Sequence, residues 1–236
     1  MSLQVVFFDL YETLITEYTS PRQSLASTAA LLGVDTQSLD REWRARHHSR
    51  MVGHYPDVAS VLREICHALG HTIDERVICA LEQERQATKA LPFKHIDHAL
   101  LEGLREIRKT GVMLGVISNC APEEAMGWST SPLAPFFDDY VFSYQVGYAK
   151  PDPHIYRLAC KRMAIEPGQA IFIGDGGSGE LEGAARLGIC AYRAAWFCDL
   201  WPDEWPSYYP DMTGYPLLHS FGDACSLVKE KYTAGC

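Results

Sequence analysis

Several polar residues lie at the ends of short apolar runs or before a proline, and their side chains are of types that take part in catalysis. A carboxylate can attack an electrophilic atom or bind a metal ion, and a lysine can balance the charge of an anion. Hydroxyl and amide groups can donate hydrogen bonds to a negatively charged oxygen. The residues at these places are Asp9, Ser118, Asn119, Lys150 and Asp175.

The acidic residues favour a magnesium site. Asp175 lies in the glycine-rich segment GDGGSGELEG, which leads into a predicted helix that carries Glu180. Together with Asp9, these carboxylates offer the hard oxygen ligands that Mg²⁺ prefers. The same segment satisfies the pattern G-x-G-x-x-G, but an acid inside that loop would repel the pyrophosphate of a dinucleotide. A nucleotide site is therefore the weaker interpretation.

Two other interpretations of the polar residues remain open. Cys120, next to Asn119, could act as a catalytic thiol. His67 and His71 have the i, i+4 spacing of a zinc site on a helix, but no third ligand is evident nearby. The chain has eight cysteines and no C-x-x-C pair, which predicts reduced and mostly buried thiols.

The apolar runs predict the elements that must position these residues. They are rich in β-branched and aromatic residues, as buried strands are, and they alternate with helical patterns such as Ala99–Thr110 and Pro153–Ala164. This alternation predicts an α/β fold with a doubly wound, mostly parallel sheet, whose carboxyl edge would bring the polar residues together. The predicted strands are Val5–Phe8, Val112–Ile117, Ala170–Ile173 and Cys190–Arg193.

A helical domain is expected between the first two strands. No strand run interrupts residues 20–90, which predicts an all-helical cap at 17–92 beside a core domain formed by 1–16 and 93–236. The cap would cover a ligand at the carboxyl edge of the sheet. Residues 197–216, dense in Trp, Tyr and Pro, predict an ordered loop packed on the core. The helices expected in the cap open at Ser20-Pro21 or span Asp40–Met51, Asp57–Leu69 and Asp74–Leu91.

Composition narrows the class of ligand and the location. The 236 residues carry a formal net charge of -9, which argues against a nucleic-acid partner, because such binding depends on Lys and Arg. No run of about 18 apolar residues suggests a membrane span, and the first residues lack a basic region followed by an apolar signal core. We expect a cytoplasmic protein with a small-molecule ligand, either a monomer or a homodimer.

The four polar groups, in this order, resemble the motifs of the haloacid dehalogenase superfamily of hydrolases over essentially the whole chain. The first appears as DLYET, the second as SN, the third as KPDPHIY and the fourth as GDGGSGELEGA. The predicted helical domain resembles the small cap that follows the first motif in that family.

The resemblance implies covalent catalysis. Asp9 would attack phosphorus or carbon and form an aspartyl intermediate that water then hydrolyses. Thr13, Ser118 and Lys150 match the positions that hold the transferred group and the nucleophile. Asn119 would lie with them in the substrate site.

In the phosphatase branch of the family, Mg²⁺ would be bound by Asp9, the backbone carbonyl of Tyr11 and Asp175, with Glu180 close by. Most of these phosphatases carry a second Asp where this chain has Tyr11. A phenol has an ordinary pKa of about 10 and is a poor base at neutral pH. General acid and base catalysis should therefore be weaker here.

Tyr11 is instead similar to the first motif of the L-2-haloacid dehalogenases, which expel halide without a proton donor. Trp43-Arg44 and Tyr156 resemble residues of the substrate pocket in those enzymes, although an ordinary amphipathic helix also explains Trp43-Arg44. Asp175 argues the other way, because these dehalogenases need no metal and carry Ser and Asn in the fourth motif.

The sequence thus predicts first a Mg²⁺-dependent phosphatase acting on a small phosphorylated metabolite through Asp9. The alternative is a 2-haloacid dehalogenase that uses Arg44 and Tyr156 and binds no metal. A third possibility is a binding protein that keeps the fold without catalysis.

Overall fold

The computed structural model describes residues 2–19, 24–72, 74–201 and 214–233. The strands of this part of the chain form one six-stranded sheet in the order β3-β2-β1-β4-β5-β6, and every neighbouring pair is parallel. The strands are β1 (Val5–Phe8), β2 (Met113–Ser118), β3 (Asp139–Phe142), β4 (Ala170–Gly174), β5 (Cys190–Ala194) and β6 (Leu217–Leu218). The predicted doubly wound, parallel α/β fold is confirmed.

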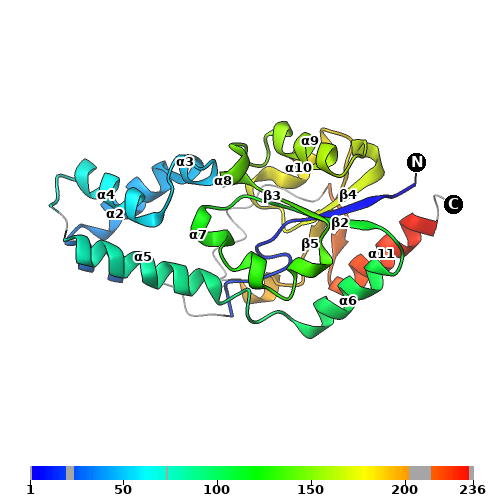
Figure 1. The fold of residues 1–236 in the computed structure, drawn as a ribbon, viewed down its shortest axis with the longest axis horizontal. Helices are drawn as coiled ribbons and strands as arrows, with labels where there is room; N and C mark the ends of the chain where they lie inside the picture. Colours follow the sequence, from blue (N-terminus) through cyan, green and yellow to red (C-terminus); the bar gives the residue numbers. More distant parts are fainter. Residues whose placement is uncertain (1, 20–23, 73, 202–213, 234–236) are drawn as a thin grey trace.

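Strand β1 lies at the centre of the sheet and is buried on both faces. Its side chains alternate, so Val6 and Phe8 belong to one apolar cluster and Val5 and Phe7 to another. Such a strand reads as a continuous apolar run because both faces are covered by helices. Figure 1 shows α9 and α10 on one face and α6 and α11 on the other.

The helices of these layers pack on the sheet through their apolar residues. The long ones are α6 (His98–Arg108), α9 (Pro153–Arg162) and α11 (Phe221–Thr233), and α10 (Glu180–Ala185) is shorter. Two short helices, α7 (Pro122–Ala125) and α8 (Ser143–Val146), follow the ends of β2 and β3. They lie at the carboxyl edge of the sheet.

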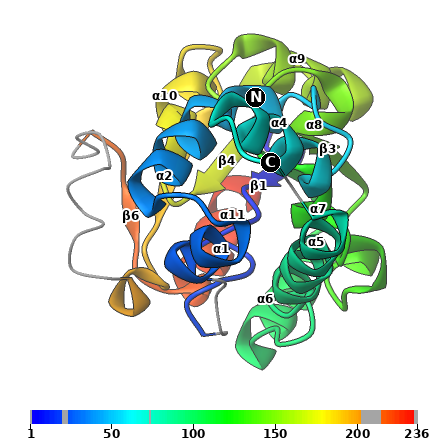
Figure 2. The same cartoon turned by 90° about the vertical axis from the view of Figure 1, so that its left-hand side faces the viewer.

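Between β1 and α6 the described chain contains five helices, which we call the helical insertion. They are α1 (Leu25–Leu32), α2 (Thr36–Ala45), α3 (His47–Met51), α4 (Val58–Ala68) and α5 (Glu75–Ala90). They have their own buried apolar cluster, which includes Leu39, Ile65 and Ile78. Figures 1 and 2 show them gathered at one end of the molecule, beyond the sheet. The division at residues 16/17 and 92/93 stays a prediction.

Side-chain caps fix where most of the longer helices begin. An acidic or hydroxyl side chain accepts a hydrogen bond from a backbone N–H of the first turn, which satisfies a donor that has no partner inside the helix. These N-caps are Ser24, Asp35, Asp57, Asp74, Asp97 and Asp152.

The predicted elements differ from the observed ones in a few places. The predicted helix Asp40–Met51 is two helices, because the helical backbone is interrupted at Arg46, which ends α2 and precedes α3. Strands β3 and β6 were not predicted. The helix start expected at Ser20-Pro21 and most of the loop expected at 197–216 lie outside the described residues. In the described part of the chain no helix is both long enough and apolar enough to cross a membrane.

Candidate active site

The residues predicted at the strand ends gather at the carboxyl edge of the sheet. Asp9 follows β1 and Asp175 follows β4, and these two strands are direct neighbours. Ser118 ends β2 on the other side of β1, and Asn119 follows it. Lys150 comes from the loop before α9. The topology thus brings five residues from four distant segments of the sequence to one place.

Lys150 is the buried cation at the centre of this group. Its Nζ donates to Asp9 Oδ1 and to Glu180 Oε2, the latter at 2.5 Å. The ammonium is nearly inaccessible to solvent, with 2% of its side chain exposed. Burial opposes the charged form, but Asp9 and Glu180 outweigh it and raise the pKa of Lys150. Lys150 therefore stays positive beside Asp9.

Asn119 holds the backbone of Lys150 rather than its ammonium. Asn119 Nδ2 donates to the Lys150 carbonyl at 2.8 Å, and Lys150 N donates to Asn119 Oδ1 at 2.6 Å. This pair of hydrogen bonds joins the end of β2 to the loop before α9. Asn119 also lines the adjoining cavity.

The acidic residues form a set with the chemistry of a metal site. Asp9, Asp175 and Glu180 are buried, and each offers a carboxylate oxygen within 4.8 Å of the others. Burial raises the pKa of Asp9 to about 6, with Asp175 adding to the rise and Lys150 opposing it. Burial and the negative charge of Asp9 raise the pKa of Glu180 as well. Oxygen-rich, negatively charged surroundings of this kind fit a hard divalent cation such as Mg²⁺.

Glu180 is held in place by the glycine-rich turn and by Tyr156. Gly176 N donates to Glu180 Oε1 at 3.0 Å, and the Tyr156 hydroxyl donates to the Glu180 carbonyl at 2.7 Å. A Cβ added to Gly174 would lie 2.1 Å from Glu180 Oε1, so only glycine permits this approach. Tyr156 is fully buried and is not among the described residues that line the cavity. Its position suits support of Glu180.

Thr13 and Ser118 are both buried, and neither is among the described residues that line the cavity at Asp9. Thr13 is fully buried, and its Oγ1 has no hydrogen-bond partner among the residues that the structure describes. A buried hydroxyl without a partner costs stability, and such groups gather at functional sites. Ser118 is 1% exposed at the end of β2.

The Tyr11 hydroxyl is not available as a proton donor to a substrate. Its hydroxyl donates to the backbone carbonyl of Glu124 at 2.7 Å, and Lys89 Nζ lies 5.3 Å from the centroid of its ring. Burial and the negative charge of Glu124 raise its pKa well above the ordinary value. The phenol is therefore a hydrogen-bond donor to α7 and a weaker acid than free tyrosine.

A cavity of about 390 Å³ joins these residues to the helical insertion. From the sheet domain, Asp9, Lys150 and Asp175 line it. The insertion contributes Trp43, His47, Arg50, Arg85 and Lys89 to its wall. A small molecule bound at Asp9 would therefore contact the insertion.

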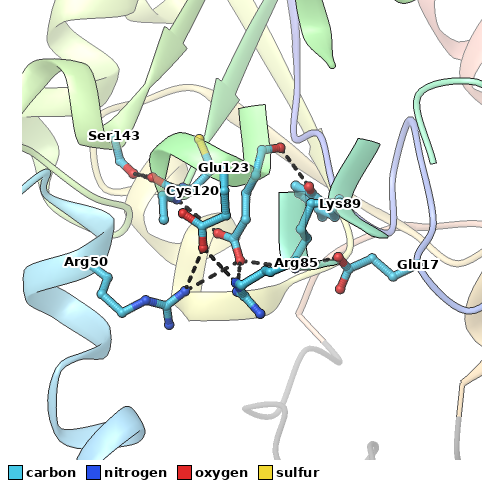
Figure 3. Close-up of polar contacts among 10 residues, drawn as sticks. Glu17, Arg50, Arg85, Lys89, Cys120, Glu123 and Ser143 are labelled. Carbon is cyan, nitrogen blue, oxygen red and sulfur yellow. Dashed lines mark hydrogen bonds and ion pairs between the residues drawn. The ribbon is translucent and has the colours of Figure 1, made fainter. Parts of the chain in front are cut away.

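An ion-pair network lines part of this cavity, with its cations on α3 and α5, two of its acids on α7 and a third acid, Glu17, between β1 and α1 (Figure 3). Arg85 donates to Glu123 at 2.9 Å and to Glu124 at 3.1 Å, and Arg50 pairs with Glu123 at 3.4 Å. Lys89 pairs with Glu124 at 3.1 Å and with Glu17 at 2.5 Å. Burial would raise the pKa of Glu124, but Lys89, Arg85 and Arg50 lower it below its usual range.

Arg44, predicted as a substrate residue, lies outside this arrangement. It pairs with Asp40 at 2.8 Å on the exposed face of α2, and 66% of its side chain is exposed. Neighbouring helix residues point about 100° apart. Because Trp43 lines the cavity, Arg44 faces away from it, and Arg50 and Arg85 supply the guanidinium groups there.

The sequence interpretation missed Arg50, Arg85, Lys89 and Glu124. Arg85 and Lys89 lie at i, i+4 on α5, and the pair Glu123-Glu124 directly follows the proline that opens α7. Those spacings place charges on one helix face, but nothing in them shows which segment faces them. Cys120 and the histidine pair gain no support: Cys120 is buried with a raised pKa, and His67 and His71 are exposed.

Comparisons with known proteins identify the family of this chain. A family model described as haloacid dehalogenase-like hydrolase matches residues 3–188. A validoxylamine A 7'-phosphate phosphatase from Streptomyces hygroscopicus subsp. limoneus is 28% identical over 79% of this chain and 83% of its own. The chain spans only 10% to 43% of the length of several other curated relatives that it matches.

Two solved structures share their fold with this chain. An L-2-haloacid dehalogenase from Xanthobacter autotrophicus, with chloropropionic acid covalently bound, superposes with a TM-score of 0.64 at 18% identity, over 96% of this chain and 98% of its own. A family enzyme from Bacteroides thetaiotaomicron, in complex with magnesium and inorganic phosphate, gives 0.57 at 18% identity, over 81% and 94%. Since the family model spans most of the sequence, the chain belongs to the haloacid dehalogenase-like hydrolases.

Proposed function

We propose that this hydrolase is a Mg²⁺-dependent phosphatase that acts on a small phosphorylated molecule through Asp9. The observation that carries the proposal is the buried set of Asp9, Asp175 and Glu180 around Lys150. Three carboxyl groups face one ammonium group there, and a divalent cation would favour the ionised form of all three. A phosphatase among the curated relatives and a magnesium complex among the similar folds support the same proposal.

Each residue of the site would have a distinct role in the reaction. An Asp9 oxygen attacks phosphorus, the P–O bond to the leaving group breaks, and the phosphoryl group is joined to Asp9. Water then attacks that phosphorus, and phosphate leaves with Asp9 restored. Lys150 holds Asp9 and offsets charge on the phosphoryl oxygens, and the Thr13 and Ser118 hydroxyls donate to those oxygens.

Mg²⁺ would be held by Asp9, Asp175 and the backbone carbonyl of Tyr11, with Glu180 completing the acidic set. When bound, the ion supplies positive charge that allows an anionic phosphate to approach the Asp9 carboxylate. Both oxygens of Glu180 already accept hydrogen bonds, from Lys150 and Gly176. We therefore assign Glu180 chiefly to positioning Lys150.

The alternative, hydrolysis of a carbon–halogen bond, has one observation in its favour. The Tyr11 hydroxyl is committed to the Glu124 carbonyl, and a halide leaves without a proton. Asp175 remains unexplained in that reaction, because a second buried carboxylate beside the nucleophile would repel a 2-halo acid anion. We therefore rank this function second.

A paired assay tests the proposal. Release of phosphate from 4-nitrophenyl phosphate and of halide from 2-chloropropionate are each measured with Mg²⁺ and with a chelator. We expect Mg²⁺-dependent phosphate release, lost by a factor on the order of 10³ or more in Asp9→Asn, with the fold intact by circular dichroism. Metal-independent halide release would overturn the phosphatase in favour of the dehalogenase. No turnover of either substrate in wild type, equal to Asp9→Asn, would favour a binding protein.

A further inference from the structure

Glu12, between Tyr11 and Thr13 in the loop after β1, has an unusual backbone conformation. Its φ angle is 56°, in the left-handed region where glycine is the default residue because a side chain crowds the following carbonyl. Its carboxyl group is also costly to hold, since only 8% of the residue is exposed and burial raises its pKa to about 7. Glycine would avoid both costs. Because glutamate nevertheless occupies this position, contacts of its side chain are expected to offset them.

The carboxyl group of Glu12 accepts three hydrogen bonds, which we call the Glu12 brace. Thr16 Oγ1 donates to Oε2 at 2.7 Å, and Glu17 N donates to Oε1 at 3.0 Å. Trp201 Nε1, from the segment between β5 and β6, donates to Oε2 at 3.1 Å. The brace therefore fixes both carboxyl oxygens and joins the loop after β1 to two other segments of the chain.

Thr16 and Glu17 belong to the connection that leads from β1 into the helical insertion. The Glu17 carboxylate pairs with Lys89 of α5 at 2.5 Å (Figure 3). Glu12, Glu17 and Lys89 all line the cavity at Asp9. The backbone N–H of Asp9 itself donates to a carbonyl of β4 at 2.9 Å. The brace thus links the loop that carries Asp9, which is fixed to the sheet, with a wall of the cavity that comes from the insertion.

We propose that Glu12 is a positioning residue, whose carboxyl group fixes the connection to the insertion and thereby holds the insertion wall of the cavity in place relative to Asp9. The inference rests on the proposed function, because it takes Asp9 as the nucleophile. Glu12 itself has no part in bond making or proton transfer. Without the brace, a substrate held between Asp9 and the insertion loses its alignment with the attacking oxygen, which lowers kcat more than it raises KM.

The test compares Glu12→Ala with Glu12→Gly, which both remove the brace but differ in backbone strain. Glycine tolerates a positive φ and alanine does not, so Glu12→Gly should resist urea better than Glu12→Ala. We expect kcat on 4-nitrophenyl phosphate with Mg²⁺ to fall at least about tenfold in both variants, and KM to change less than about threefold. A wild-type kcat in Glu12→Gly would overturn the proposal, because activity would then follow stability alone.

Three further variants isolate the brace. Glu12→Gln keeps an acceptor oxygen for Thr16 and Trp201 and should retain a higher kcat than Glu12→Ala. Thr16→Val removes one donor at nearly constant volume and should lower kcat by a smaller factor of about three, so it still decides the question if Glu12→Ala does not fold. Ala164→Gly is the matched control for strain, because Ala164 has a φ of 55° and is not among the described residues that line the cavity. It should keep the wild-type kcat.

Failure of the inference and failure of the proposed function give different results. If wild type releases phosphate and Glu12→Gly does so at the same kcat, the phosphatase stands and the positioning role is wrong. If wild type releases only halide, the phosphatase fails and the same variants are compared on 2-chloropropionate, where Asp9 is also the nucleophile. If neither product is released, amide hydrogen exchange decides: faster exchange at residues 14–19 in Glu12→Gly than in wild type supports the brace, and equal exchange overturns it.

Discussion

Tyr11 stands two residues after the proposed nucleophile, where a phosphatase of this family usually has an acid. Its hydroxyl is used to hold α7 through the Glu124 carbonyl. The Glu124 carboxylate is paired with cations and has a lowered pKa, so it too is a poor proton donor at neutral pH. A leaving group that needs no protonation should therefore react best, whether an aryl oxide or a halide.

Replacement of Tyr11 by an acid should widen the range of leaving groups. We expect Tyr11→Asp to raise the rate on an alkyl phosphate relative to an aryl phosphate by at least about tenfold, because only the alkoxide needs a proton. Tyr11→Phe is the control: the ratio should not change, and unfolding should become easier by about 1 kcal/mol, since the Glu124 carbonyl loses its donor. The measurements are kcat/KM for both substrates and urea unfolding. An unchanged ratio in Tyr11→Asp would show that proton donation does not limit the rate.

The helical insertion is fastened to the sheet domain chiefly where α3 and α5 meet α7. Cations lie on one side of this contact and acids on the other, and Glu123 is only 4% exposed. Helix α7 begins a few residues after Ser118. The position of the insertion is thereby tied to the edge of the sheet that carries the proposed catalytic residues.

Removal of one cation from this contact should cost far more than removal of a similar surface cation. Arg85→Met leaves Glu123 and Glu124 short of a partner, and we expect a loss of roughly 2–4 kcal/mol in the free energy of unfolding. The control, Arg63→Met, breaks an exposed pair with Glu75 that also reaches α5, and should cost far less, because solvent screens an exposed pair. Urea denaturation of both variants measures the difference. Equal losses would mean that the network contributes no more than a surface pair.

The sequence predicted those elements whose residues carry a local signal. Val5–Phe8 is a run of four apolar residues that predicts a buried strand without knowledge of its neighbours. The position of Asp9 at the carboxyl edge of the sheet follows from that strand. Strand β3 begins with an acid and β6 has two residues, so neither shows a pattern that distinguishes it from a loop. The cations of α3 and α5 could not be assigned, because their partners depend on how the insertion packs against the sheet.

The sequence also could not predict which way a side chain on a helix points. Trp43 and Arg44 are adjacent, and a motif match cannot tell which of the two faces the cavity. Packing decides it: Trp43 lies beneath Arg50, and Arg44 is paired with Asp40 outside. The resemblance thus identified the part of α2 that lines the cavity. It was wrong about Arg44, which does not supply the guanidinium group of that cavity.

At the scale of the whole molecule, the fold concentrates negative charge where its elements converge. The formal net charge is -9, and three of its acids are buried together at the carboxyl edge of the sheet with Lys150. Buried like charges repel, so this arrangement costs stability unless a cation binds. Metal binding should therefore be linked to folding of the whole chain.

Addition of Mg²⁺ should accordingly stabilise the protein in the absence of any substrate. At ten times the dissociation constant, one site adds about 1.4 kcal/mol, which corresponds to a rise in Tm of roughly 3–6 °C for a chain of this size. Asp175→Asn should abolish the rise while leaving the metal-free Tm equal or higher, because a buried charge is removed. Glu182→Gln, an exposed acid on the same helix as Glu180, is the control and should keep the full rise. Calorimetric scans with and without Mg²⁺ measure this, and a wild-type Tm that Mg²⁺ does not move would argue against the magnesium site and for the metal-free dehalogenase.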